Sequence, residues 1–344
     1  MLFAWQWQRT EQKIVMPAYA QKRTLMLSKA WMLCTFLPMF LICAFMYDVG
    51  NDYINYSVYF RRIANGQEQS VDLGYKLMNY LIAKMGLNFQ WVIIIISLIS
   101  FALLIIAIHK YSGNYALSYL LFMVSGYFYL LGINQIRQFT AVGIVCLAYQ
   151  YIEKEECLKY IILVLIAGTF HFTAFILIPF YWILNKKWRA SIFFMICMVL
   201  LPFNLFYNKI MVFLFATFLP RYLNSNYISK SFSIDIPYLC MILTVFLLTL
   251  IYAHLLEEKR YNRIFINCIW IGTIIALFGS WLPEYKRFVY YFFVPAFFIL
   301  PQIFVVEKRK ILRWLVLGAE VAACLLYLVM ASGTWSVIPY KSIL

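Results

Sequence analysis

Long apolar runs separated by short polar segments dominate the chain. Residues 91–108 form almost unbroken apolar sequence, and similar runs recur as far as residue 331. A membrane-spanning helix needs about 20 apolar residues, or about 17 if it stands upright. The runs therefore predict about eleven membrane helices, at about 25–47, 89–109, 115–131, 135–152, 158–169, 171–184, 190–206, 236–256, 264–281, 287–306 and 312–331.

The runs also indicate the fold class. Strands of a membrane barrel alternate apolar and polar residues over about ten positions, and residues 91–108 do not. Internal repeats and a separate hydrophilic domain are both absent from the sequence. We therefore predict an all-α polytopic membrane protein, with residues 1–344 forming a single integral membrane domain.

The pair 158–169 and 171–184 is short for two spans and is open to being read as one long helix. Cytoplasmic loops are enriched in Lys and Arg. With eleven crossings and a cytoplasmic N-terminus, the inner segments hold most of the 29 Lys and Arg residues. Merging 158–184 into one helix would place Lys259, Arg260 and the basic run 308–310 outside. We therefore expect a short or re-entrant hairpin at 158–184, with its tip at 168–171.

This topology defines three segments outside the membrane. Residues 1–24 form a cytoplasmic N-terminal segment, 48–88 a first outer segment and 207–235 a second outer segment. Within the first, apolar residues at helical spacing predict an amphipathic interfacial helix over 73–85. The run 210–219 is apolar but too short to span, which favours a second interfacial piece.

Composition excludes several classes of protein. The chain is 65% hydrophobic and 12% charged, whereas about a quarter of the residues in soluble domains are charged. The net charge of +15 arises from basic clusters between apolar runs, so nucleic-acid binding is not predicted. The eight cysteines lie almost all within apolar runs and match core residues. Phosphate-cradling and metal-binding motifs are absent, so neither a metal nor another cofactor is expected.

The unusual polar residues gather at the predicted outer boundary. Arg137 and three amides interrupt the apolar sequence at 132–140. Charge is costly at that depth in a membrane, so an ionisable residue there is a candidate for function. A rigid guanidinium fork at such a boundary suits phosphate or pyrophosphate. The same side carries Asp52, Tyr53, Glu68, Asp72, Gln138, His171, Arg221, Glu284, Lys286 and Arg287. Several have simpler interpretations: Asp72 as a solvated carboxylate, Arg137 as an interfacial side chain and His171 as a core histidine.

These residues fall in motifs that resemble the EpsG family, a branch of the Wzy-type polysaccharide polymerases. The resemblance covers roughly residues 30–300. The motifs are Gly50-Asn51-Asp52-Tyr53-Ile54-Asn55-Tyr56, Glu68 followed by Gly74-Tyr75, Ile136-Arg137-Gln138, and Phe170-His171-Phe172-Thr173-Ala174 with Pro179 beyond. The interval between Glu68 and Gly74 is longer than the family pattern, which leaves Glu68 and Asp72 as alternatives for one role.

The resemblance implies a membrane glycosyltransferase of GT-C-like fold in the bacterial plasma membrane, with its active site outside. Its substrates would be undecaprenyl-pyrophosphate-linked oligosaccharides, polymerised into a capsule, O-antigen or exopolysaccharide. Membrane lipids, a chain-length regulator and a flippase would be its partners. Arg137, Gln138, Arg287, Lys286, Arg221 and Tyr53 would bind pyrophosphate or glycan. His171, Asp52 or Glu68 would be the general base, with His171 slightly favoured.

Two other functions are open at this point. A flippase for lipid-linked sugars predicts charged residues through the midplane and symmetric discontinuous helices, but only Glu320 lies deep in an expected helix. An acyltransferase that modifies surface glycans predicts a polar path from the cytoplasmic face, and the sequence shows none.

Overall fold

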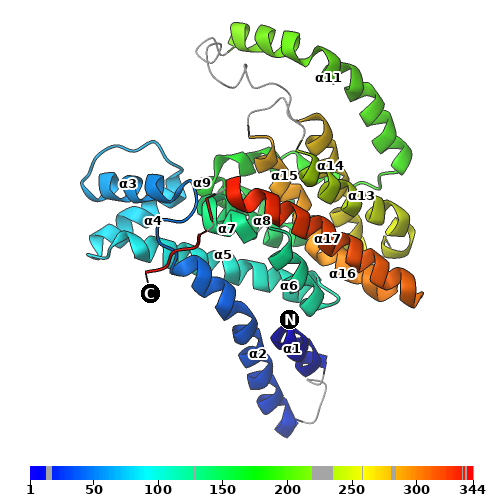
Figure 1. The fold of residues 1–344 in the computed structure, drawn as a ribbon, viewed down its shortest axis with the longest axis horizontal. Coiled ribbons are helices and arrows are strands. Elements are labelled where there is room, and N and C mark those ends of the chain that lie inside the picture. The colour runs from blue at the N-terminus through cyan, green and yellow to red at the C-terminus, as the bar shows by residue number, and fades with distance from the viewer. Residues whose placement is uncertain are drawn as a thin grey trace.

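The fold is described from a computed structural model of the chain. It describes residues 1–344 except 13–17, 127–128, 219–234, 258, 280–283, 335, 338 and 344. Within that part of the chain the structure is helical, and the β-type pairing is one isolated bridge between Met46 and Ser342. The prediction of an all-helical fold is therefore confirmed for these residues (Figure 1).

The helices follow the predicted order closely. The first half contains α1 (Leu2–Gln12), α2 (Ala18–Ala44), α3 (Tyr53–Ala64), α4 (Leu73–Lys84), α5 (Phe89–Tyr111), α6 (Tyr115–Val124), α7 (Tyr129–Asn134), α8 (Ile136–Glu153) and α9 (Cys157–Phe170). The second half contains η1 (Phe172–Leu177), α10 (Phe180–Leu184), α11 (Ala190–Phe218), α13 (Ile236–Leu256), α14 (Arg260–Phe278), α15 (Lys286–Phe293), α16 (Ala296–Val306) and α17 (Lys310–Thr334).

Among the described residues, five helices are long and apolar enough to cross a membrane. They are Thr24–Ala44, Phe89–Tyr111, Ile236–Leu256, Arg260–Phe278 and Lys310–Met330. A sixth arises if α15 and α16, which are bent by 42°, form one broken span. The predicted count of about eleven is not confirmed, because several expected spans are short or interrupted. The run 115–131, for example, is divided between α6 and α7, and Gly126 between them has a positive φ.

Residues 158–184 fold back on themselves. The hydroxyl of Tyr160 in α9 donates a hydrogen bond to the carbonyl oxygen of Leu177, 2.9 Å away, and the Tyr160 and Tyr181 ring centroids are 5.5 Å apart. In one straight helix, residues 17 positions apart would be separated by about 25 Å. A Cβ on Gly168 would lie 2.1 Å from the Phe175 ring, so the two arms touch. The segment is therefore a hairpin and not one helix.

α11 continues through Pro202 to Phe218. The apolar run expected as a separate interfacial piece at 210–219 is thus, as far as residue 218, the last part of this helix. In Figure 1 α11 reaches away from the other helices. Near its start, the Phe193 ring stacks on Phe246 of α13 at 4.5 Å. Arg221 lies outside the described residues.

α8 lies at the centre of the fold and is mostly buried between α5 and α9. Its Gly143 packs against Leu103 of α5, where a Cβ would be 3.1 Å from the Leu103 Cβ. The hydroxyl oxygens of Thr140 and Ser100 lie 2.7 Å apart across the same contact. This close packing fixes the N-terminal turn of α8, which carries Arg137.

α3 and α4 lie side by side at one edge of the molecule (Figure 1). The predicted amphipathic helix at 73–85 is α4, which buries Tyr75, Asn79 and Ile82 on one face. Its opposite face exposes the apolar residues that suggested it, namely Leu73, Leu77, Tyr80, Leu81 and, just after the helix, Met85. α4 therefore has one buried face, which includes the polar Asn79, and one exposed, mostly apolar face.

Candidate functional site

Asp72, at the N-terminus of α4, connects two side chains far from it in sequence. Its Oδ2 lies 2.7 Å from Arg137 Nη1 and 3.7 Å from His171 Nδ1. Its Oδ1 accepts a hydrogen bond of 3.2 Å from the backbone N–H of Phe172. We call Asp72, Arg137 and His171 the Asp72 cluster. Arg137 and His171 were both predicted to carry the chemistry. Asp72, whose role the sequence leaves open, is the residue that brings them together.

The local fold brings these three residues together for identifiable reasons. α8 begins where α9 ends, because the two helices pack against each other and are joined by the short turn between Glu153 and Cys157. Arg137 in the first turn of α8 and His171 just after α9 therefore share one end of the pair. α4 reaches that end because Gly74 lacks a Cβ, which would lie 2.5 Å from Thr169 Oγ1.

Arg137 lies within a set of tyrosine rings. Its guanidinium carbon is 5.4 Å from the centroid of Tyr75, 5.6 Å from that of Tyr56 and 6.0 Å from that of Tyr59. Rings at these distances stabilise a cation and orient its plane. Within the described residues, Arg137 Nε and the Tyr75 hydroxyl are buried without a hydrogen-bond partner. Such groups are costly unless a ligand or water satisfies them.

Asp52 is tied to the residues just before α8. Its backbone N–H donates to Asn134 Oδ1 at 3.2 Å, and the Tyr56 hydroxyl donates to its carboxylate at 3.5 Å. Gly50 has a φ of +84°, and a Cβ there would lie 2.8 Å from Asn134 Oδ1. A side chain at position 50 would therefore disrupt the contact. Two separate sequence motifs, 50–56 and 136–138, thus meet through Asn134.

The start of α15 completes the site. Gln138 Nε2 donates to the carbonyl oxygen of Arg287 at 2.6 Å, and Arg287 Nε lies 3.3 Å from Glu284 Oε2. On the next turn of α15, the hydroxyl of Tyr291 lies 3.0 Å from Thr173 Oγ1 in the hairpin. These contacts hold Arg287 beside the first turn of α8.

Burial and neighbouring charges shift the pKa values of Asp52, Asp72 and His171 in different directions. Burial lowers the pKa of the His171 imidazole, with Arg287 and Arg137 acting the same way and Asp72 only partly opposing them. Burial opposes ionisation of Asp72, but its interactions with His171 and Arg137 prevail and hold its pKa below the usual value. Burial raises the pKa of Asp52 despite the nearby arginines. At neutral pH His171 is therefore uncharged and Asp72 is ionised.

His171 has the state that a general base requires. A proton on Nδ1 facing Asp72 leaves the lone pair on Nε2 as an acceptor. His171 is 4% exposed, and among the described residues neither ring nitrogen has a hydrogen-bond partner. Asp72 lies beside Nδ1 at 3.7 Å, and Nε2 is the nitrogen left to accept a proton.

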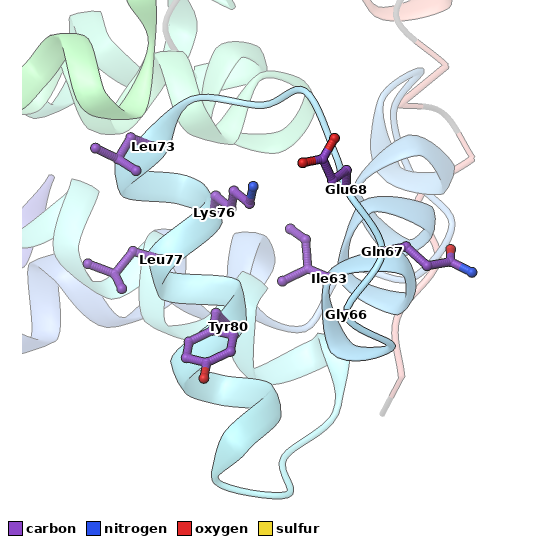
Figure 2. Close-up of a pocket in the computed structure, with 8 residues that line it drawn as sticks. All are labelled: Ile63, Gly66, Gln67, Glu68, Leu73, Lys76, Leu77 and Tyr80. Carbon is purple, nitrogen blue, oxygen red and sulfur yellow. The ribbon is translucent and has the colours of Figure 1, made fainter.

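Other predicted site residues lie apart from the Asp72 cluster. Glu68 is exposed on the loop between α3 and α4, where it lines a separate hollow (Figure 2). Tyr53 packs its ring against Phe89 at 5.5 Å. Lys286 forms an ion pair with Asp235 and lies 4.8 Å from the Tyr238 ring centroid. Arg221 falls outside the described residues.

The position of Asp72 gives little indication of its role in the sequence, because an acid before a helix is usually a solvated loop residue or a cap. The available signal was its position two residues before Gly74-Tyr75, in the motif that the family resemblance singled out. Among the described residues, no group of three or more His, Cys, Asp or Glu side chains is arranged to hold a metal ion.

Comparison with known proteins gives one clear result. The model of the EpsG family matches residues 29–342, nearly the whole chain. No curated protein and no solved structure gives a significant match. The matched range includes all the motifs that meet around the Asp72 cluster, from Gly50 to Arg287. The protein therefore belongs to the EpsG family, whose members are associated with polysaccharide biosynthesis.

Proposed function

We propose that this protein polymerises oligosaccharide repeat units linked to undecaprenyl pyrophosphate, at the outer face of the bacterial plasma membrane. The observation that carries the proposal is the Asp72 cluster, which places a caged arginine and a buried histidine beside the same carboxylate. A polymerase needs both, because one must stabilise an anionic leaving group and the other must accept a proton.

Arg137 is the group proposed to hold the donor pyrophosphate. Its planar fork matches phosphate oxygens, and its tyrosine cage keeps that fork in one plane. One nitrogen contacts Asp72, while Nε has no partner among the described residues. Arg287 is the second cation proposed for this role, since Gln138 anchors its backbone beside Arg137. Negative charge that develops on the pyrophosphate as its bond breaks is stabilised by such preset cations.

The reaction assigned to the site balances without a cofactor. The acceptor hydroxyl oxygen attacks the anomeric carbon of the donor sugar. The bond from that carbon to the pyrophosphate oxygen breaks, and its electron pair leaves with the lipid pyrophosphate. The hydroxyl proton passes to Nε2 of His171. Asp72 acts as a positioning residue, since it orients the imidazole and stabilises the imidazolium that forms.

Asp52 is the alternative base. Burial raises the pKa of its carboxyl group, and Tyr56 donates to this carboxylate from within the tyrosine cage. Tyr56 also lies 5.6 Å from the Arg137 guanidinium carbon, so Asp52 is one side chain away from the Asp72 cluster. We favour His171, because Asp72 lies beside its Nδ1 at 3.7 Å and its Nε2 has no hydrogen-bond partner among the described residues.

A reconstituted assay tests the proposal. The purified protein in vesicles is given a synthetic lipid-pyrophosphate oligosaccharide on the side that carries the Asp72 cluster. A ladder of products that each gain one repeat unit is expected, together with release of lipid pyrophosphate. Movement of intact substrate across the vesicle membrane without a ladder would instead establish a flippase. Transfer of an acyl group to the glycan without a ladder would establish an acyltransferase.

A further inference from the structure

A hollow lies between α3 and α4, distinct from the Asp72 cluster. Its volume is about 370 Å³, within the range of small-molecule sites. We call it the α3–α4 hollow. It is lined by Ile63, Gly66, Gln67, Glu68, Leu73, Lys76, Leu77 and Tyr80 (Figure 2).

The position of this hollow relates it to the reaction centre. Leu73, one of its lining residues, directly follows Asp72 in the chain. Its walls come from the two helices whose N-termini hold Asp52 and Asp72. The hollow therefore begins beside the first turn of α4, the turn that follows Asp72.

Two oppositely charged side chains face the hollow. In Figure 2 Glu68, Lys76 and Ile63 point into the space between α3, the loop and α4, and Gln67 points away from it. Within the part of the chain that the structure describes, neither Glu68 nor Lys76 forms an ion pair or a side-chain hydrogen bond. One acceptor and one donor are therefore available to a ligand.

These charges favour a ligand that can both donate and accept hydrogen bonds. A hydrocarbon chain would remove two ionised groups from water without giving either a partner, which is strongly unfavourable. An anion would meet the Glu68 carboxylate, and a cation would meet the Lys76 ammonium group. A neutral ring with hydroxyl groups satisfies both, because a hydroxyl donates to a carboxylate and accepts from an ammonium group.

The rest of the lining fits the same ligand. A sugar ring has an apolar face of C–H groups, and the Tyr80 ring and Ile63 supply apolar surface for it. We propose that the α3–α4 hollow is a subsite for a neutral sugar ring of the glycan, with Glu68, Lys76 and Tyr80 as its contacts. This inference rests on the proposed function, and it makes Glu68 a sugar-binding residue and not the general base.

Binding of free oligosaccharide tests the subsite without any need for turnover. The probe is the oligosaccharide freed by mild acid from lipid-linked repeat units of the cells that encode the protein. Its contact with the detergent-solubilised full chain is followed by saturation-transfer NMR. Loss of one hydrogen bond to a charged group weakens binding roughly tenfold, so we expect that loss in both Glu68→Gln and Lys76→Gln, and a comparable loss in Tyr80→Ala.

The matched control is Leu81→Ala, which removes an exposed apolar side chain of α4 that does not line the hollow. It should bind the oligosaccharide as the wild type does. Equal binding by the wild type and all three hollow variants would overturn the subsite. A second result would also overturn it: farnesyl phosphate binds the wild type and loses affinity in Tyr80→Ala, while the oligosaccharide does not bind at all.

Arg137→Lys separates this inference from the proposed function. If both hold, that variant loses polymer formation but binds free oligosaccharide normally. Polymer loss in Arg137→Lys together with unchanged binding in the hollow variants would reject the subsite alone. Oligosaccharide binding that depends on Tyr80, in a wild-type protein that forms no ladder, would support the subsite and reject the polymerase.

Discussion

The carboxylate of Asp72 lies 2.7 Å from the guanidinium group of Arg137, although 65 residues separate the two in sequence. The same carboxylate lies 3.7 Å from Nδ1 of His171, a residue 99 positions after Asp72 in the sequence. One acid thus links the proposed phosphate-binding residue to the proposed base. Asp72 forms an ion pair with Arg137 in the free protein and lies beside the His171 ring.

Replacement of Arg137 by Lys keeps the charge but removes the planar fork. We expect polymer formation to fall about 10²-fold, the loss typical when one preset donor is removed from a developing oxyanion. Product ladders and surface glycan length on gels measure the effect. Arg61→Lys, on the exposed face of α3, is the control and should retain normal chain length. Normal polymer in Arg137→Lys would remove the pyrophosphate role.

The pH dependence of turnover tests the base. His171 acts in its uncharged form, so activity is present above its pKa and is lost as pH falls through that pKa. Because burial lowers that pKa, the loss should occur below 6.5, the usual value for histidine. His171→Gln should remove this acid limb and most of the activity. An acid limb that persists in His171→Gln would transfer the role to Asp52.

Asp72→Asn should shift the same acid limb in a defined direction. The carboxylate of Asp72 raises the pKa of His171, so its removal lowers that pKa and moves the limb to lower pH. The rate at the plateau should also fall, because the imidazolium formed during turnover loses its partner. A purely structural role for Asp72 would lower activity at all pH values and leave the limb in place.

A side chain at Gly74 should separate α4 from α9. A Cβ there would meet Thr169 Oγ1 at 2.5 Å and the Thr169 carbonyl oxygen at 3.1 Å. We expect Gly74→Ala to lower stability by about 1–3 kcal/mol, as overpacking does, and to reduce polymer formation by displacing Asp72. Thermal unfolding in detergent measures the first effect.

Gly318→Ala is the matched control for Gly74→Ala. Gly318 is also helical. In the part of the chain that the structure describes, a Cβ there would meet no heavy atom of a neighbouring segment within 4 Å. Its replacement should leave stability unchanged or slightly raised, since alanine favours helix. Equal destabilisation by the two substitutions would mean that the α4–α9 contact is not responsible.

Glu68→Gln distinguishes binding from catalysis in the polymerase itself. If Glu68 contacts a sugar ring, its replacement raises KM about tenfold and leaves kcat nearly unchanged. If Glu68 is the base, kcat falls by a factor of about 10²–10⁴. Steady-state kinetics with the synthetic lipid-linked substrate separates these two results.

Much of the helical framework was predictable from local sequence. The apolar runs at 89–109 and 236–256 correspond closely to α5 and α13, because hydrophobic length and helix formation are properties of neighbouring residues. Loop charge also predicted the hairpin at 158–184, which the contact between Tyr160 and Leu177 confirms. The number of spans was less accessible, since breaks such as that at Gly126 depend on how the two sides pack.

The sequence by itself determined that Arg137 and His171 are costly polar residues beside apolar helices, and it predicted both as site residues. Only the tertiary structure decided that Asp72 joins them, and that Glu68 lies in another hollow. The reason is physical: local pattern reports burial and helical face, whereas the meeting of Asp72 with Arg137 depends on the close approach of α4 to α9 at Gly74. That approach is a property of packed surfaces distant in sequence.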